Sequence, residues 1–378
     1  MNGFANDRGS IFIPRAELNT GSDAPVLALG AAAGDRICLL DRRGAHISSP
    51  AQVITADLLR CEELIGEFLA DFSEPPQIVA YDPAPGCLAA NLAKIYLAEH
   101  PTARAVPVLH RQAHIAAVLA EHDVGGEVCA LMLDTDSYGG DGALWGGDLM
   151  TGSAAASERI GHMHHLKLLG YSADSYQPWR TAIAAVASVC GRDKAIELFS
   201  ARADVERVLH LATLDGIAPL STSMERLFEV ISVIAGLADD FLPEAPPHEL
   251  LNEACDPEAS GVYSFNLVRN SAGLIEFDWT PIVRDAVTDM LAGESAGTVC
   301  SRFQRSISLL AEDIAIRHCM GRPTLLCGEL FSDERLLRGC ISSFRVRGVP
   351  VYSGRLVPGT DRFISFGQAA AAAAMNGR

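Results

Sequence analysis

Two histidines four residues apart carry the strongest chemical signal in this chain of 378 residues. His110 and His114 stand at the start of a predicted helix. Side chains four residues apart lie on one face of a helix, close enough for both imidazoles to bind one metal ion. Two unrelated histidines on a helix surface would give the same pattern. The pair alone therefore leaves two alternatives open, a metal site and a polar helix surface.

Two aspartates at the ends of predicted strands or loops favour the metal site. Residues 128–133 form an apolar run with the length of a buried strand, and Asp134 follows at once. Near the C-terminus, a loop after the predicted strand 350–352 ends in Asp361. Two imidazoles and two carboxylates make a mixed nitrogen and oxygen ligand set, which suits Zn²⁺, Fe²⁺ or Mn²⁺.

The composition limits the partners and the compartment. The formal net charge is −17, which opposes binding to the phosphates of a nucleic acid. No apolar run reaches membrane-spanning length, and the first 20 residues lack the apolar centre of a signal peptide. The 10 cysteines are scattered without a Cys-x-x-Cys pair, which indicates neither zinc fingers nor a disulfide framework. We therefore predict a cytoplasmic protein that binds neither nucleic acid nor a membrane.

The spacing of the apolar residues predicts two units that each begin with a β-hairpin. In the first half we expect strands at 26–29, 36–41, 45–48, 78–81 and 105–109 and helices at 56–72 and 86–99, before the histidine helix. In the second half we expect a hairpin of strands 128–134 and 143–150, helices within 179–242, at 299–319 and at 333–347, strands at 323–326 and 350–352, and a last helix from about 365. Such a repeat predicts an α/β fold of two lobes around a cleft.

The predicted domain organisation follows from these elements. Residues 1–24 are expected to form an N-terminal extension, and residues 25–124 a first lobe that a C-terminal helix at 365–378 completes. Residues 125–364 are expected to form the second lobe, with a helical insertion at about 179–320. The proline- and acid-rich stretch 239–257 is predicted to be a surface loop or an excursion between helices.

Several motifs in a fixed order resemble the C-terminal carbamoyl-transfer module of the HypF family, the carbamoyltransferases of NiFe-hydrogenase maturation. The matching blocks are residues 110–115, 134–147, 158–162, 178–180, 221–228 and 356–368. Related modules occur in antibiotic O-carbamoyltransferases and in tRNA threonylcarbamoyl transferases, and the negative charge of this chain weakens the tRNA interpretation. The resemblance implies an actin and sugar-kinase type (ASKHA) duplication. It also implies four metal ligands, namely His110, His114, Asp134 and Asp361.

The chain departs from the family in the loops that bind phosphate and nucleotide. The positions that the resemblance assigns to cofactor binding are Gly30, Asp136, Ser137, Gly139, Glu225, Gly328 and Glu329. The first loop has lost the family's lysine and ends in an acid, and the acids at 136, 225 and 329 replace glycine or neutral residues. Glycine lets backbone amides approach phosphate closely, and an added carboxylate repels it. We expect an eroded site with weak or absent binding of ATP or carbamoyl-adenylate.

The function implied by the resemblance is transfer of a carbamoyl group from carbamoyl-adenylate to a cysteine thiol. The acceptor would be the C-terminal cysteine of a hydrogenase maturation protein, and a separately encoded adenylate-forming domain would supply the donor. His162 is the candidate proton acceptor for the thiol, acting as a catalytic residue. The alternative is a catalytically degenerate paralogue that binds metal and serves as a scaffold or regulator in maturation.

Other reactive side chains have simpler interpretations. His164 and His165 are expected to cover a strand surface rather than to extend a second metal cluster with His162. Cys327 stands where the family has serine, and a packed thiol is the default because no histidine or lysine adjoins it in sequence.

Overall fold

The computed structural model describes residues 9–21, 23–139, 141, 143–171, 176–239, 245–319 and 321–377. Parts of three predicted segments lie outside these ranges: residues 1–8 and 22 of the N-terminal extension, Gly140 and Gly142 of the matching block 134–147, and residues 240–244 of the proline- and acid-rich stretch. The last residue of the predicted C-terminal helix, at 378, also lies outside them.

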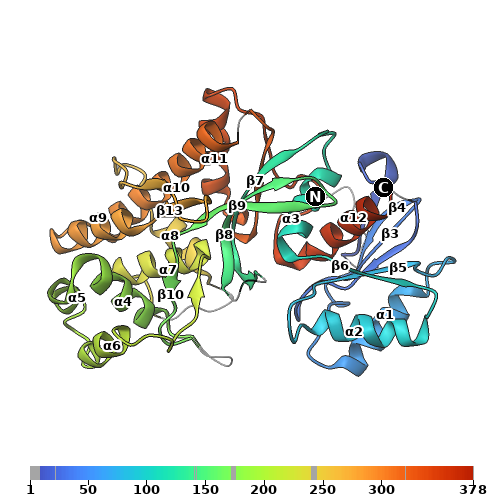
Figure 1. The fold of residues 1–378 in the computed structure, drawn as a ribbon, viewed down its shortest axis with the longest axis horizontal. Coiled ribbons are helices and arrows are strands. Elements are labelled where there is room, and N and C mark those ends of the chain that lie inside the picture. The colour runs from blue at the N-terminus through green and yellow to red at the C-terminus, as the bar shows by residue number, and fades with distance from the viewer. Residues whose placement is uncertain are drawn as a thin grey trace.

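The fold is a succession of layers, which Figure 1 shows from right to left. Helices α1 (Leu58–Leu69) and α2 (Leu88–Glu99) cover the outer face of a first sheet, and α3 (His110–Ala120) and α12 (Ile364–Asn376) lie on its inner face. Helix α3 also packs against a second sheet, whose far face carries the remaining large helices. The histidine helix therefore lies between the two lobes.

The first sheet has six strands in the order β1-β4-β3-β2-β5-β6. They are β1 (Ile11–Pro14), β2 (Val26–Ala28), β3 (Cys38–Asp41), β4 (Gly44–Ile47), β5 (Ile78–Tyr81) and β6 (Arg104–Pro107). Strand β1 pairs with β4 in antiparallel register. The segment predicted as an N-terminal extension thus contributes an edge strand to the first sheet.

The second sheet has nine strands, and its main path is β12-β13-β9-β8-β7-β14-β15. The strands of this path are β7 (Val128–Tyr138), β8 (Leu144–Gly152), β9 (Ser157–Met163), β12 (Asn266–Arg269), β13 (Ile275–Asp278), β14 (Thr324–Cys327) and β15 (Val351–Tyr352). The short strands β10 (Leu166–Lys167) and β11 (Leu220–Ser221) pair with each other, and β11 adjoins β8.

The two sheets repeat one pattern of pairing. The path β4-β3-β2-β5-β6 has two antiparallel pairs followed by two parallel pairs, and so does β9-β8-β7-β14-β15. Helix α3 follows the last strand of the first series, and α12 follows the last strand of the second. The predicted α/β duplication of two lobes is therefore confirmed.

The segment between β10 and β14 is mostly helical, but it also adds strands to the second sheet. Its helices are α4 (Pro178–Cys190), α5 (Arg192–Leu198), α6 (Val205–Ala212), α7 (Met224–Ile234), α8 (Pro247–Ala254), α9 (Thr280–Leu291) and α10 (Ala296–His318). Strand β13 lies parallel to β9, with β12 at its outer edge. The predicted helical insertion at about 179–320 thus contains this hairpin besides its helices, and the stretch 239–257, predicted as a surface loop or an excursion between helices, contains α8.

Local capping fixes where several helices begin. The carboxylate of Asp57 accepts hydrogen bonds from the amides of Leu59 and Arg60 at the start of α1. Asp333 does the same for the amides of Arg335 and Leu336 at the start of α11 (Glu334–Val346). These caps satisfy amides that have no partner within the helix.

Helices α3 and α12 approach each other closely because α12 is built from small residues. A Cβ atom at Gly367 would lie 2.0 Å from the carbonyl oxygen of Ala113. Only glycine fits at this crossing, and the alanines that follow it are buried. The contact joins the C-terminal end of the chain to the histidine helix. Among the described residues, no helix combines the length and the apolar character needed to cross a membrane.

Candidate metal centre

The two histidines form one wall of a buried site at the start of α3. Their rings lie on one face of the helix, with centroids 4.8 Å apart and planes inclined by 70°. His110 and His114 are both buried, although imidazole is polar. A plain surface helix is therefore excluded.

Two aspartates from the second lobe close the site. Asp134 lies on β7, where the pairing with β8 becomes irregular between Leu133 and Ser137. Such an irregularity re-aims side chains and often occurs beside functional sites. Asp361 begins the short 3₁₀ helix η3 (Asp361–Phe363), directly before α12. The four side chains thus come from α3, β7 and η3, three segments far apart in sequence.

The donor atoms are spaced as ligands of one ion. The Nε2 atoms of His110 and His114 are 3.2 Å apart and lie 3.0 and 3.2 Å from Oδ1 of Asp361. The same two nitrogens lie 3.4 and 3.3 Å from Oδ2 of Asp134. Metal bonds of about 2.0–2.1 Å place tetrahedral ligands about 3.3 Å from one another.

One buried oxygen in the site has no hydrogen bond, which supports the fit to a cation. Oδ2 of Asp134 is buried and accepts no hydrogen bond from the described residues. A buried carboxylate oxygen without a partner is costly unless a cation approaches it. The donor set of two imidazoles and two carboxylates fits Zn²⁺ or Fe²⁺. The structure therefore contains a candidate metal-binding cluster.

Neighbouring groups hold the candidate ligands in orientation. Oδ2 of Asp82 lies 3.8 Å from Nδ1 of His110, the ring nitrogen that faces away from the cluster. The hydroxyl of Thr135 donates a hydrogen bond of 3.3 Å to Oδ2 of Asp361. The amide of Glu329 donates a bond of 2.9 Å to Oδ1 of Asp134. Contacts of this kind select the tautomer and the direction of a metal ligand.

The electrostatics of the cluster favour ionised aspartates. Burial lowers the pKa of His114, but the carboxylates of Asp134 and Asp361 outweigh burial and raise it to about 9. Burial also opposes ionisation of Asp134, yet the two imidazoles hold its pKa well below the usual range. The cluster attracts positive charge, which a divalent ion would supply.

Gly328 and Glu329 adjoin the candidate ligands. Gly328 has φ +104°, and a Cβ atom there would lie 2.4 Å from the carbonyl oxygen of Leu133. Glycine is therefore required where β14 leaves the sheet beside β7. The Oε2 atom of Glu329 accepts a hydrogen bond of 2.8 Å from the amide of Asp361. Glu329 thus turns its carboxylate toward the candidate metal centre.

Four ionisable side chains form a second buried group, which we call the Arg226 cluster: Asp136, Glu225, Arg226 and Glu229. The guanidinium of Arg226 lies 2.8 Å from Asp136, 2.9 Å from Glu225 and 2.5 Å from Glu229. Ser221 donates a further bond of 2.6 Å to Asp136. Two of the positions predicted to bind nucleotide, Asp136 and Glu225, therefore pair with a cation of the protein itself.

The first predicted phosphate loop is occupied by its own aspartate. Oδ2 of Asp35 accepts hydrogen bonds of 2.7 and 2.9 Å from the amides of Ala31 and Ala32. Gly30 has φ +74° and exchanges two bonds of 2.9 Å with the amide group of Gln368 on α12. Backbone amides of this kind cradle anions. Here a carboxylate of the chain takes the place that a phosphate oxygen would need.

Ser137 and Gly139 lie at the end of β7, beside stacked cationic and aromatic groups. Arg111 donates hydrogen bonds to the Ser137 hydroxyl and to the Tyr138 carbonyl. Its guanidinium carbon lies 4.5 Å from the ring centre of Trp145. A Cβ atom at Gly139 would lie 2.1 Å from Nε1 of the same indole. These two predicted cofactor positions therefore shape the turn, and the Ser137 hydroxyl is bound by Arg111.

His162 lies apart from the four candidate ligands, on β9. Its Nδ1 atom lies 2.8 Å from the carbonyl oxygen of Met163, and its Nε2 atom 3.2 Å from the amide nitrogen of Asn270. Both ring nitrogens thus have a protein partner, and His162 is not part of the candidate metal group. Its role as a proton acceptor stays a prediction.

A small cavity of about 40 Å³ lies on one side of the histidine helix and borders His114, Cys327 and Gly328, but none of the other three candidate ligands. It has room for about one water molecule, whereas pockets for drug-sized ligands measure about 300–1,000 Å³. Cys327 itself is buried, and burial raises the pKa of its thiol, as expected of a packed cysteine.

Family models match both lobes of the chain. The model described as the HypF Kae1-like domain matches residues 21–121. The model described as "Carbamoyltransferase, Kae1-like Domain, second subdomain" matches residues 130–368, more than half of the chain. The chain belongs to the HypF family. The predicted resemblance is thereby confirmed.

Named relatives are longer than the part that matches this chain. Carbamoyltransferase HypF2 of Cupriavidus necator is 28% identical over 386 residues, which cover 94% of this chain and 47% of that protein. Carbamoyltransferase HypF of Rhizobium leguminosarum bv. viciae is also 28% identical and covers 95% of this chain and 46% of its own length. The chain therefore spans about half the length of these relatives.

Two crystal structures share the fold. Full-length HypF in its phosphate- and nucleotide-bound form has a TM-score of 0.85 at 24% identity, over 96% of this chain and 57% of that protein. HypF of T. kodakarensis has a TM-score of 0.79 at 19% identity, over 96% of this chain and 48% of that one. The two-lobed architecture is thus that of the HypF structures.

Three parts of the site were not assigned from the sequence. Asp82 behind His110 and Gln368 behind Gly30 are contacts between distant segments, which local patterns do not reveal. Asp35 carried a local signal, because an aspartate four residues after a loop amide often accepts its hydrogen bond.

Proposed function

We propose that this chain transfers a carbamoyl group from carbamoyl-adenylate to a cysteine thiol at a divalent metal held by His110, His114, Asp134 and Asp361. One observation carries the proposal: four donor atoms converge, with a buried Asp134 oxygen left without a hydrogen bond, in a chain whose family consists of carbamoyltransferases. The resident metal would be Zn²⁺ or Fe²⁺. When bound, it would stabilise negative charge that develops during acyl transfer.

The proposed reaction exchanges a thiol for a phosphate at the carbamoyl carbon. The thiol sulfur forms a bond to this carbon, the bond from the carbon to the phosphate oxygen breaks, and AMP leaves with the electron pair. The thiol proton passes to solvent, and the product is a thiocarbamate. Asp82 and Thr135 keep His110 and Asp361 in place during the exchange.

The donor must reach a centre whose ligands are buried except for Asp361. The side chain of Asp361 is 32% exposed, so we propose that the donor approaches the metal from the side of Asp361. Because Asp35 fills the amides of the first loop, we expect weak affinity for free nucleotide. We therefore propose that a separately encoded adenylate-forming protein delivers the unstable donor directly. The proposed acceptor is the C-terminal cysteine of a hydrogenase maturation protein in the cytoplasm.

A second candidate function is favoured by the Arg226 cluster. In a catalytically degenerate scaffold, the acids at the nucleotide positions would be satisfied within the protein, as Asp136 and Glu225 are by Arg226. Such a protein would bind the metal and the maturation partner without transferring the carbamoyl group.

The test is a reconstituted transfer. The metal-loaded chain is mixed with a carbamoyl-adenylate-forming partner, ATP, carbamoyl phosphate and a peptide ending in cysteine, and thiocarbamate is measured by mass spectrometry. We expect product with the wild type and with His210→Ala, which removes an exposed histidine of α6, and none with His114→Ala. Stable binding of metal and partner without any thiocarbamate would establish the scaffold instead.

A further inference from the structure

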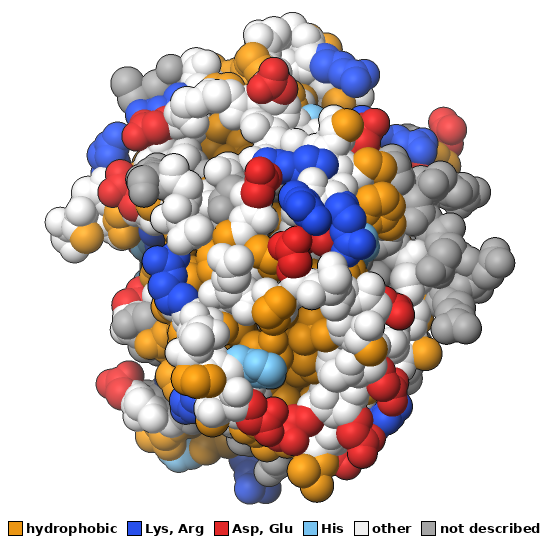
Figure 2. Space-filling model, turned by 90° about the vertical axis from the view of Figure 1, so that its right-hand side faces the viewer, with side chains coloured by type: hydrophobic (Ala, Val, Ile, Leu, Met, Phe, Trp, Pro, Cys, Tyr) orange, Lys and Arg blue, Asp and Glu red, His pale blue; other side chains and the backbone are white. Residues whose placement is uncertain are grey.

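A groove on the outer face of the first lobe lies between α1 and α2, and we call it the α1/α2 groove. Its volume is about 350 Å³. Figure 2 shows apolar side chains gathered in a hollow in the lower part of this face, with acidic side chains along its margin. Helices α1 and α2 cover the face of the first sheet opposite to α3 and α12. The groove is therefore separated from the candidate metal centre by a whole sheet.

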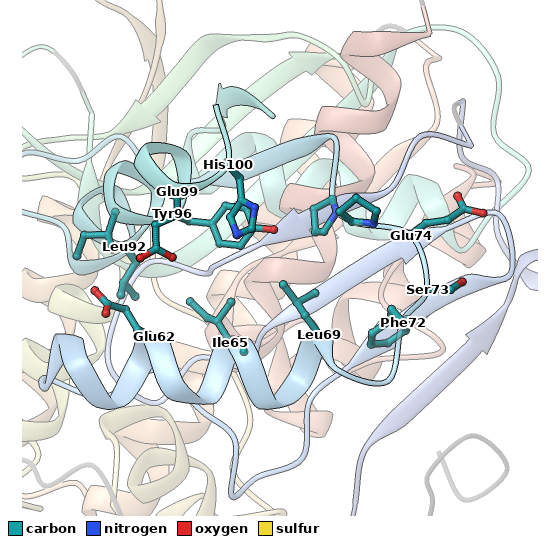
Figure 3. Close-up of a pocket in the computed structure, with 14 residues that line it drawn as sticks. Glu62, Ile65, Leu69, Phe72, Ser73, Glu74, Leu92, Tyr96, Glu99 and His100 are labelled. Carbon is teal, nitrogen blue, oxygen red and sulfur yellow. The ribbon is translucent and has the colours of Figure 1, made fainter. Parts of the chain in front are cut away.

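The floor of the groove is made of two short apolar rows. Ile65 and Leu69 lie one turn apart on α1, and Leu92 and Tyr96 lie one turn apart on α2. Figure 3 shows these side chains directed into the space between the helices. Ile65, Leu92 and Tyr96 are buried, whereas Leu69, Phe72 and Ile95 also line the groove and are partly exposed. These three partly exposed side chains offer a contact surface for the apolar stripe of a third helix.

Gly66 keeps this groove open at a cost to α1. It lines the groove in the middle of the helix, where glycine is less favourable than alanine by about 1 kcal/mol. A Cβ atom at Gly66 would meet no other atom within 4 Å. No packing contact therefore requires glycine here, and the missing side chain leaves room above the floor.

The charge around the groove is acidic. Glu62 and Glu99 lie together at one end, as Figure 3 shows, and no ion pair or hydrogen bond joins either side chain to another described residue. Glu74, at the other end, pairs with Arg42 at 3.2 Å. No lysine or arginine lines the groove within the described part of the chain. Two unpaired carboxylates beside an apolar floor complement a ligand that is apolar and cationic.

We propose that the α1/α2 groove binds an amphipathic helix of a partner protein. The apolar stripe of that helix packs on Leu69, Phe72 and Ile95, and a lysine or arginine beside the stripe faces Glu62 and Glu99. A second copy of this chain is the poorer occupant, because each copy carries a net charge of −17. This interaction is independent of carbamoyl transfer and uses the opposite face of the first sheet.

The test uses three designed helical peptides as probes. They share one stripe of leucine and phenylalanine and carry lysine, glutamine or glutamate beside it, and their binding is measured by fluorescence anisotropy. We expect the lysine peptide to bind best and the glutamate peptide worst. Gly66→Leu fills the groove and should weaken the lysine peptide at least about tenfold, since it removes the pocket for the apolar anchor. Gly66→Ala should weaken binding of the lysine peptide by a smaller factor.

Charge variants separate specific binding from general attraction. Glu62→Gln/Glu99→Gln should lower affinity for the lysine peptide about threefold to tenfold, to the level of the glutamine peptide. Glu253→Gln/Glu258→Gln makes the same change in net charge at exposed positions of the second lobe and should leave affinity unchanged. Thermal unfolding of each variant checks the fold, and both Gly66 variants should melt no lower than the wild type.

Three outcomes would overturn the proposal. They are equal binding of the three peptides, full binding to a folded Gly66→Leu variant, and an equal loss of binding in the two charge variants. Self-association of the wild type in sedimentation, abolished by Gly66→Leu, would assign the groove to a second copy instead.

Discussion

The candidate metal cluster and the Arg226 cluster begin two residues apart on β7 and solve the same electrostatic problem differently. Asp134 faces two imidazoles and a second carboxylate, with no arginine or lysine among the four side chains. Asp136 faces Arg226, which two further glutamates share. The first cluster needs a cation from outside, whereas the second contains its own. The metal cluster keeps a buried carboxylate oxygen without a hydrogen bond, whereas the acids of the Arg226 cluster are paired within the protein.

Removing the cation of the Arg226 cluster should have the largest effect on stability. Arg226→Met removes the cation that Asp136, Glu225 and Glu229 share, and loss of one member of a buried ion pair costs about 3–5 kcal/mol. Chemical denaturation measures this difference. Arg338→Met is the matched control, because Arg338 forms an exposed pair with Glu334 and should contribute less than about 1 kcal/mol. Equal losses of stability in the two variants would show that the Arg226 cluster contributes no more than an exposed ion pair.

The same cluster should make stability fall as pH rises through neutrality. Burial raises the pKa of Glu225 to about 7 and that of Glu229 to about 8, against the opposing charge of Arg226. Between the unfolded value of 4.5 and these values, the folded chain holds protons that the unfolded chain has released. The free energy of unfolding therefore decreases with pH in this window, by about 1 kcal/mol per unit for one retained proton.

Glu229→Gln isolates the contribution of one carboxyl group. In the variant, the free energy of unfolding should decrease less between pH 5 and pH 8 than in the wild type, as measured by urea unfolding at several pH values. The interpretation fails if wild type and variant show parallel curves.

The smallest expected effect concerns phosphate binding at the first loop. We expect ATP to bind weakly in calorimetry, with a dissociation constant well above the low micromolar range, because carboxylates near phosphate repel it. Asp35→Ala frees the amides of Ala31 and Ala32 and should raise the affinity for ATP several-fold. Asp41→Ala, which removes a partly buried aspartate of the first sheet, should not. Low micromolar ATP binding by the wild type would show that the site is not eroded.

The sequence was sufficient for the parts of the structure that depend on local pattern. The strands of both hairpins, the histidine helix and the helices around them follow from apolar spacing and turn residues. The four candidate ligands could be named because a family resemblance supplied Asp134 and Asp361. Spacing alone predicts only that His110 and His114 lie close together, because a separation of four residues on a helix fixes the distance between two side chains. It does not predict the position of Asp361, which lies in a loop more than two hundred residues away.

The features that were missed depend on pairing between strands that are distant in sequence or on several acids sharing one guanidinium. Strand β1 is short and finds its partner β4 only in the folded sheet. Strands β12 and β13 have four residues each and lie between helices α8 and α9, in a segment that is mostly helical. The acids at 136 and 225 were expected to repel nucleotide. Glu225 and Glu229 are local partners of Arg226 on α7, but the contact of Asp136 with the same guanidinium depends on how α7 packs against β7.

Metal content of the purified chain tests the central claim most directly. Elemental analysis after exhaustive dialysis should find about one zinc or iron per chain in the wild type and in His164→Ala/His165→Ala, which removes two histidines outside the cluster. It should find strongly reduced metal in a folded His110→Ala/His114→Ala variant. Equal metal in all three proteins would contradict the assignment of His110, His114, Asp134 and Asp361 as the metal ligands.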